Sequence, residues 1–243
     1  MSQRLILPLN TARVTAGYKV PIYVQQYGYN HFGCDYNDVK VGFAQKAYGM
    51  GEGIVTHCGL DTRCGNVICL VYKDVELHDG TIMDVACRLY HLSSIAVRKG
   101  QAVNKNTYLG NIGNTGMVSS GVHLHVEFDR DANYPNYTPQ IGGNGTILRK
   151  AVATGSQPAD TTINPSTVLW IGPEQSIIPT KYTGGWISDE DYELPFATII
   201  PEYDGDPALK RALDDALNQI DELKLENSGY KQRLAEIATL ATK

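Results

Sequence analysis

The sequence predicts a mainly β domain followed by a C-terminal helix, and three features lead to this division. Short runs rich in β-branched and aromatic residues recur between Gly, Asn and Asp over residues 1–173. Residues 174–206 hold several Pro, Gly and acidic residues, which is the composition of a linker. From 207 to 243 the apolar residues recur at alternating steps of four and three instead.

Within the β region, the strongest local signal is Asp79-Gly80, a dipeptide typical of tight hairpin turns. It separates two runs that have the composition of strands. We therefore expect these two runs to form a β-hairpin. The β-type runs are 20–26, 53–56, 67–72, 82–90 and 122–128.

The C-terminal region has the period of a coiled coil, with Asp206-Pro207 as a plausible helix start. Asn227 falls at an a-type position, where a polar residue favours one register in parallel dimers. We therefore expect residues 207–243 to form a homodimer or to dock on a partner; the alternative is a single amphipathic helix packed on its own domain. The seam is Leu209, Leu213, Ala216, Ile220, Leu223, Asn227, Tyr230, Leu234 and Ile237.

Composition narrows the classes of function. The formal net charge of −5 argues against a general nucleic-acid-binding protein, because phosphate contacts need clustered Lys and Arg. The sequence has no apolar window of about 20 residues, so no membrane span is expected. Residues 1–8 have neither an apolar core nor a small-residue cleavage site, so we expect no secretory signal.

The cysteines argue against a zinc ribbon, because no C-x2-C pair occurs. Their odd number leaves at least one thiol unpaired within the chain. A bridge between Cys58 and Cys64 would close a turn-like segment, and the alternative is that the thiols are small buried groups. The five are Cys34, Cys58, Cys64, Cys69 and Cys87.

Two histidine patterns can supply metal ligands. His31 and Asp35 form an H-x3-D pattern, in which Gly33 allows a tight turn. His123 and His125 form H-x-H in a β-type run, where alternate side chains point to the same face. Catalytic zinc takes three protein ligands and keeps a position open for water. His31, Asp35 and one strand histidine make three, but spacing does not decide which of the two histidines binds.

Three segments resemble the signature segments of lysostaphin-type (LytM-like) zinc peptidases, in the same order and at similar spacing. They are HFGCDY at 31–36, LYHLSS at 89–94 and GNTGMVSSGVHLHVEF at 113–128. The resemblance covers roughly residues 10–129, with a weaker tail that reaches Asn164-Pro165-Ser166. It implies a mainly β, antiparallel-sheet metallopeptidase domain of the lysostaphin type over 1–173. The implied activity is hydrolysis of peptide bonds in bacterial peptidoglycan with one Zn²⁺ per chain.

The resemblance also implies roles for five side chains. His31, Asp35 and His125 would hold the zinc ion, while His91 and His123 would be catalytic without binding it. The division of His91 and His123 between proton transfer and stabilisation of a developing oxyanion stays open. Further residues are expected to line the substrate groove: Tyr27, Tyr29 and 116–120.

Other readings of the same sequence give different expectations. A non-catalytic wall-binding or virion structural module could keep this fold, although degenerate members of the family usually lose ligands. An unrelated zinc hydrolase could use H-x-H in a β framework. A serine nucleophile is disfavoured, because no G-x-S-x-G occurs. Cleavage of purified cell walls, with analysis of the products, separates these readings.

The resemblance places the action of the protein at the bacterial cell wall. Without a secretory signal in residues 1–8, another route to the wall is needed. Release from the cytoplasm of a phage host or delivery on a virion would meet that need. The sequence does not indicate which peptide bond is cut, since glycine cross-bridges and stem peptides are both substrates in this family.

Overall fold

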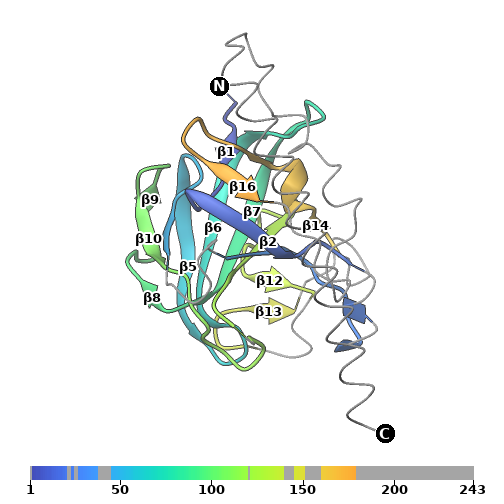
Figure 1. Ribbon diagram of the computed structural model, residues 1–243. Helices are drawn as coiled ribbons and strands as arrows, with labels where there is room; N and C mark the ends of the chain where they lie inside the picture. The colour runs from blue at the N-terminus through green and yellow to red at the C-terminus, as the bar shows by residue number, and fades with distance from the viewer. Residues whose placement is uncertain are drawn as a thin grey trace, which may run out of the picture. The chain divides into compact units, whose positions relative to one another are not determined.

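The computed structural model describes residues 2–20, 23–24, 27–37, 45–119, 121–139, 145–150 and 160–178 (Figure 1). The expected helix at 207–243 lies outside the described residues, as does most of the expected linker. Coiled-coil pairing and the domain boundaries therefore stay predictions. Among the described residues, no helix has the length and apolar character needed to cross a membrane.

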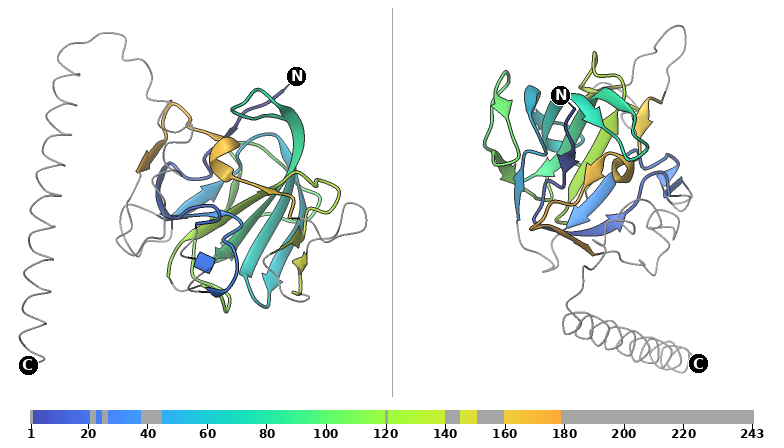
Figure 2. Two further views of the ribbon diagram at one scale, coloured as in Figure 1. Left: turned by 90° about the vertical axis from the view of Figure 1, so that its right-hand side faces the viewer. Right: turned by 90° about the horizontal axis from the view of Figure 1, so that it is seen from above.

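A nine-stranded sheet forms the centre of the described structure, and its long strands lie side by side in Figures 1 and 2. All its pairings are antiparallel except that between β16 and β2. The order is β16 (Ser176–Ile178), β2 (Thr11–Ala16), β3 (Cys34–Asn37), β11 (Leu124–Asp129), β7 (Ile82–Leu92), β6 (Gly65–Glu76), β5 (Gly53–Asp61) and β9 (Ala102–Val103), with β14 (Thr162–Ile163) also paired to β11.

Shorter elements surround this sheet. A three-stranded sheet has the order β4 (Lys46–Tyr48), β10 (Tyr108–Asn111) and β8 (Ser94–Ile95). Two parallel pairs are β1 (Leu5–Ile6) with β15 (Leu169–Trp170), and β12 (Tyr137–Thr138) with β13 (Arg149–Lys150). One 3-10 turn, η1, spans Pro165–Thr167. The expectation of a mainly β architecture on an antiparallel sheet is confirmed for the described residues.

The turn at Asp79-Gly80 joins β6 to β7, as predicted. Gly80 has a φ of 83°, a backbone conformation that L side chains rarely adopt. The Thr81 backbone N–H donates to Asp79 Oδ1 at 2.9 Å, and the Leu77 N–H donates to the Thr81 carbonyl at 2.8 Å. The turn thus satisfies its own polar groups and sets the register of the two longest strands.

The β-type run at 20–26 is a wrong prediction for the residues that the structure describes there. Tyr23 and Val24 have helical backbone, with the Tyr23 N–H donating to the Val20 carbonyl at 3.0 Å. The Gly28 N–H donates to the Val24 carbonyl at 2.8 Å. The backbone groups find partners locally rather than in a neighbouring strand, so β-branched and aromatic composition does not decide the conformation here.

The strand that carries the H-x-H pattern has the predicted alternation. Leu124 and Val126 are fully buried in the main hydrophobic core, and Val122 packs against it. His123 and His125 therefore face away from this core. The histidine pair is held on a strand whose opposite side is anchored by apolar burial.

No disulfide joins Cys58 to Cys64, so the bridge considered from the sequence does not form. Cys34, Cys64, Cys69 and Cys87 are buried, which confirms the alternative that they serve as small core side chains. Burial raises the pKa of the Cys69 thiol to about 12, a value at which it stays protonated and unreactive at neutral pH.

Candidate metal centre

The three strands at the middle of the main sheet bring Asp35 and His125 together. Asp35 on β3 is the direct cross-strand partner of His125 on β11. On its other side, His125 is the partner of Tyr90 on β7. Facing positions in an antiparallel pair place side chains within contact distance, so the ladder itself sets this pair.

His31 reaches the same point from the segment that precedes β3. Its side chain is fully buried, and the ring stacks on Tyr23 with centroids 4.6 Å apart. The Nδ1–H donates to the Gly17 carbonyl at 2.6 Å, which leaves the Nε2 lone pair free in the neutral ring. A backbone carbonyl that fixes the tautomer in this way is typical of metal-binding histidine.

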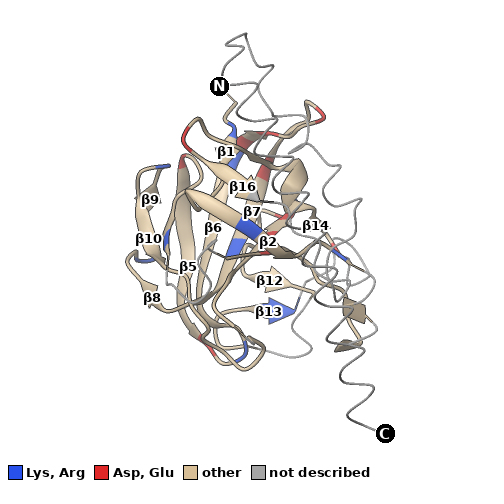
Figure 3. Cartoon of the chain, viewed as in Figure 1, with Lys and Arg blue, Asp and Glu red and all other residues tan. Residues whose placement is uncertain are grey.

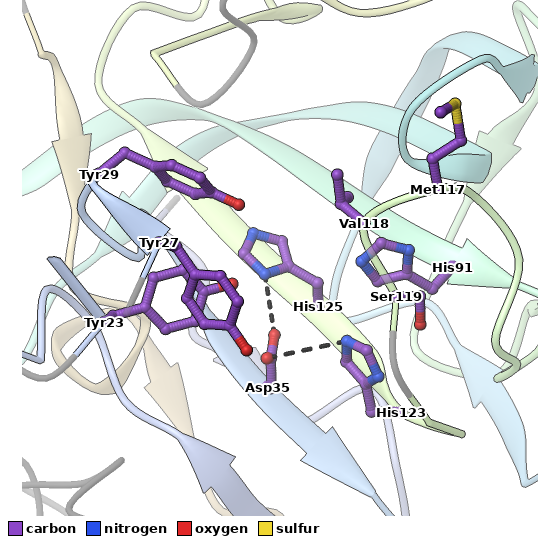
Figure 4. Close-up of a pocket in the computed structure, with 10 residues that line it drawn as sticks. All are labelled: Tyr23, Tyr27, Tyr29, Asp35, His91, Met117, Val118, Ser119, His123 and His125. Atoms are coloured by element: carbon purple, nitrogen blue, oxygen red, sulfur yellow. Dashed lines mark hydrogen bonds and ion pairs between the residues drawn. The ribbon is translucent and has the colours of Figure 1, made fainter. Parts of the chain in front are cut away.

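The three predicted ligand groups converge. His31 Nε2 lies 3.1 Å from Asp35 Oδ1 and 3.1 Å from His125 Nδ1, and Asp35 Oδ1 lies 2.8 Å from His125 Nδ1. One ligand atom from each residue lies within 4.8 Å of the others, and Figure 4 shows Asp35 beside His125. Two imidazole nitrogens and one carboxylate oxygen suit zinc and leave a position for water. The donor set therefore fits the metal that the sequence predicted.

Gly33 has a different role from the predicted one. Its φ is not positive, so the H-x3-D segment does not need glycine for a tight turn. A Cβ atom at this position would lie 2.4 Å from the Val126 carbonyl oxygen and 2.6 Å from His125 Nε2. Glycine is required because the backbone passes directly against the ring of His125.

His91 lies at the end of β7 and is 3% exposed. Its φ of 68° is uncommon for a residue other than glycine and is the kind of local strain that occurs at functional sites. The Nδ1–H donates to the Thr115 carbonyl at 2.9 Å. Burial lowers the pKa of His91 to about 3, with a further contribution from His123 and His125. His91 is therefore a neutral ring whose Nε2 carries a lone pair.

His123 completes the group of five predicted residues. Its Nδ1–H donates to the Gly121 carbonyl at 2.7 Å, and its Nε2 lies 3.7 Å from Asp35 Oδ2. The rings of His91 and His123 lie 4.7 Å apart between centroids. Neither ring belongs to the tight group of three ligand atoms.

Four of the five predicted residues, all except His31, line a pocket of about 330 Å³. In Figure 4, three tyrosines lie on one side of Asp35 and His125, and a loop that carries Met117 lies on the other. Tyr27 and Tyr29, which the sequence placed in the groove, are among the lining residues, whereas Ser120 lies outside the described residues. Sequence reasoning missed Tyr23, which sat in a run expected to be β. The full lining is Tyr23, Tyr27, Tyr29, Asp35, His91, Met117, Val118, Ser119, His123 and His125.

The electrostatics favour a cation between the ligand groups. Burial by itself raises the pKa of Asp35, but His31 and His123 hold it well below its usual range. Burial likewise lowers the pKa of His125, but the carboxylates of Asp35 and Glu127 raise it to about 9. In the metal-free chain a proton therefore occupies this position, and a bound cation would replace that proton.

The model of peptidase family M23 matches residues 30–137 of the chain. This segment contains His31, Asp35, His91, His123 and His125, the five residues that line or form the candidate metal centre. Residues 30–137 are an M23 peptidase domain.

The chain is 36% identical over 90 residues to the peptidoglycan DD-endopeptidase ShyA of Vibrio cholerae, a match that covers 37% of this chain and 19% of ShyA. The chain thus spans about a fifth of that relative's length. Among solved structures, the catalytic domain of lysostaphin from Staphylococcus simulans is 27% identical, with 49% of this chain and 80% of that chain covered and a TM-score of 0.37. A zinc-containing peptidase from Vibrio cholerae is 24% identical, with 52% and 37% covered and a TM-score of 0.40.

The M23 domain also contains a buried ion cluster that sequence reasoning did not identify. Arg88 is fully buried and donates to Glu127 Oε1 from Nε at 2.9 Å and to Asp129 Oδ2 from Nη2 at 2.7 Å. Charged residues are sparse along the rest of the sheet, as Figure 3 shows. Burial raises the pKa of Glu127, but Arg88 and His125 together lower it to about 2.

A signal for this cluster was present in the sequence. Glu127 and Asp129 follow His125 at the same two-residue interval that separates His123 from His125, so His125, Glu127 and Asp129 share one face of β11. Carboxylates on the histidine face of a buried strand require a charged partner. The partner, Arg88, lies on β7, and only the pairing of β7 with β11 identifies it.

Proposed function

We propose that the M23 domain is a zinc-dependent endopeptidase that hydrolyses peptide bonds in bacterial peptidoglycan. The observation that carries the proposal is the convergence of His31, Asp35 and His125 on one point at a pocket that also contains two further histidines. The similarity of 90 residues to a peptidoglycan DD-endopeptidase supports this substrate class.

In this proposal one zinc ion per chain is held by His31 Nε2, Asp35 Oδ1 and His125 Nδ1, the atoms that already face one another. When bound, zinc would lower the pKa of a water molecule toward about 7 and polarise the carbonyl of the scissile bond. The protein residues bind and orient the peptide and move protons around this centre.

We assign proton acceptance to His91. Its Nδ1–H is engaged by the Thr115 carbonyl, so the neutral ring can only accept a proton at Nε2. Because burial lowers its pKa to about 3, the ring is neutral across the physiological range, and its Nε2 lone pair is available. The buried position and strained backbone hold that ring in place.

We assign stabilisation of the developing oxyanion to His123. Its ring is also oriented by a backbone carbonyl, that of Gly121, and its Nε2 lies beside Asp35 rather than in the ligand group. In its charged form this ring donates from Nε2 to an oxygen that gains negative charge. His91 and His123 would then divide the two roles that the sequence left open.

The walls of the pocket suit a peptide. Tyr27 and Tyr29 offer aromatic faces and hydroxyl groups, which can contact both the apolar and the amide parts of a substrate. Met117 is 84% exposed on the opposite wall and is available for apolar contact. Apart from Asp35 and the histidines, the described lining residues carry no ionisable charge at neutral pH.

Metal removal tests the proposal directly. Treating the purified chain with a zinc chelator is expected to abolish the cleavage of purified cell walls, and one equivalent of Zn²⁺ is expected to restore it. Release of soluble muropeptides, followed by mass spectrometry, measures both steps. Activity that persists after complete removal of zinc would exclude the metal mechanism, and products that are not cleaved peptides would exclude the peptidase class.

We further propose that 1–173 carries the activity and that 207–243 pairs two chains or docks on a partner. The basis is the heptad seam that begins at Leu209. Sedimentation of the intact chain is expected to show a dimer, and a version that ends near residue 206 is expected to be a monomer with retained wall cleavage. Monomers in both cases would remove the pairing proposal.

A further inference from the structure

The candidate ligand His125 has a second ring nitrogen that points away from the ligand group. This Nε2 atom is buried and makes no hydrogen bond to any described residue. Glu127 Oε2 lies 3.6 Å from this nitrogen, which is an ion-pair distance. A buried imidazole nitrogen that has no hydrogen bond is unusual, because leaving a buried polar atom unpaired costs folding free energy.

Glu127 is held in place by three hydrogen bonds and an ion pair. Arg88 donates to Oε1 from Nε at 2.9 Å, and its Nη2 forms an ion pair with Oε1 at 2.6 Å. The hydroxyl groups of Tyr90 and Thr138 each donate to Oε2 at 3.0 Å. The carboxylate is fully buried and cannot swing away from His125 without losing these bonds.

Tyr90 adds a second constraint on the ligand ring. Its ring stacks on that of His125, with centroids 4.6 Å apart and planes 8° from parallel. The same tyrosine donates its hydroxyl to Glu127. One side chain therefore contacts both the face of the imidazole and the carboxylate behind it.

The position of Glu127 bears on which nitrogen of His125 carries the proton. A neutral imidazole can bind a metal through Nδ1 only if its proton is on Nε2. Asp35, at 2.8 Å from Nδ1, attracts a proton to that nitrogen, and this proton must leave when a metal binds there. A carboxylate at the Nε2 side opposes that attraction and favours the tautomer that can bind.

We infer that Glu127 is a positioning residue for the metal site, which orients His125 and holds its proton on Nε2, and that Arg88, Tyr90 and Thr138 hold Glu127 for this purpose. This inference rests on the proposed zinc site. It assigns the buried ion cluster a role in metal affinity in addition to its role in folding.

The test compares Glu127→Gln with Asp129→Asn in the full chain. Asp129 is buried and accepts from the same Arg88, but no contact joins it to His125. Glu127→Gln is expected to weaken zinc binding by about 10- to 100-fold, the usual effect of losing an outer partner of a metal-binding histidine. Asp129→Asn is expected to stay within about 2-fold of the wild-type affinity while weakening the same cluster.

Competition with a chromophoric chelator measures the affinities, and urea unfolding of the metal-free chains measures the stability lost in each variant. Wild-type affinity in Glu127→Gln would overturn the inference, and so would an equal loss of affinity in both variants. The proposed function fails in a different way: the wild-type chain would bind no zinc, or His125→Ala would bind it as tightly as the wild type.

A measurement on the wild-type chain covers the case in which Glu127→Gln does not fold. In the zinc-loaded chain, the Nε2-bound proton of His125 is expected to give a downfield, slowly exchanging NMR signal, because it is buried and directed at a carboxylate. A His125 ring proton that exchanges rapidly with water would contradict the role of Glu127.

Discussion

Replacing Asp35 with Ala is expected to empty the metal site and to reduce peptidoglycan cleavage to background. Asp35 supplies the carboxylate of the ligand group, with Oδ1 at 2.8 Å from His125 Nδ1 and at 3.1 Å from His31 Nε2. Without it, two buried imidazoles remain, and no anion offsets the charge of the cation. Loss of a residue that only hydrogen-bonds to a ligand already weakens metal binding by about 10- to 100-fold. Loss of the ligand Asp35 itself should therefore weaken zinc binding by more than about 100-fold.

Zinc content by elemental analysis and wall cleavage by muropeptide release measure the effect of Asp35→Ala. His57→Ala is the matched control, because His57 lies on β5, outside the residues that line the pocket, and matches none of the three family segments. The control is expected to keep one zinc per chain and wild-type cleavage. If Asp35→Ala also retained one zinc per chain, the proposed ligand set would be wrong.

Replacing His91 is expected to leave zinc in place while turnover falls by about 100- to 10,000-fold, the usual contribution of a general base. His91 contributes no atom to the group of three ligand atoms. Its Nε2 is the free nitrogen of a buried, neutral ring in the pocket. Removal of this acceptor should therefore lower kcat more than KM.

The backbone at His91 determines which variant is informative. With a φ of 68°, His91→Ala would add strain that has no bearing on proton transfer, whereas Asn tolerates this conformation better. His91→Asn is therefore the main variant and His91→Ala its companion. Both should contain wild-type zinc and show little cleavage. Loss of zinc from His91→Asn would mean that His91 is a ligand and that the assignment of the five residues must change.

The local chemistry of the site could be predicted from short stretches of sequence. The two-residue spacing of His123 and His125 indicated a shared strand face, and burial of Leu124 and Val126 on the other face agrees with it. The H-x3-D spacing paired His31 with Asp35 as candidates for one ion. These patterns can be recognised in the sequence because backbone geometry fixes, within a few residues, which side chains share a face.

Other features depend on contacts that no short stretch contains. Whether His125 meets Asp35 is decided by the register of β11 against β3, and the burial of Glu127 is tolerable because β7 places Arg88 beside it. The helical backbone at Tyr23 and the positive φ of His91 are likewise imposed by surroundings and not by residue type.

The amino-acid sequence by itself therefore determined the β architecture, the hairpin at Asp79-Gly80 and the residue types that can bind zinc. The tertiary structure decided which of those side chains face one another, which nitrogen of each ring is free, and which buried charges stand behind the ligands. The physical reason is the distance along the chain over which each effect acts. Periodicity and turn chemistry act over a few residues. A metal centre instead depends on strand register and desolvation, which arise only when distant segments pack together.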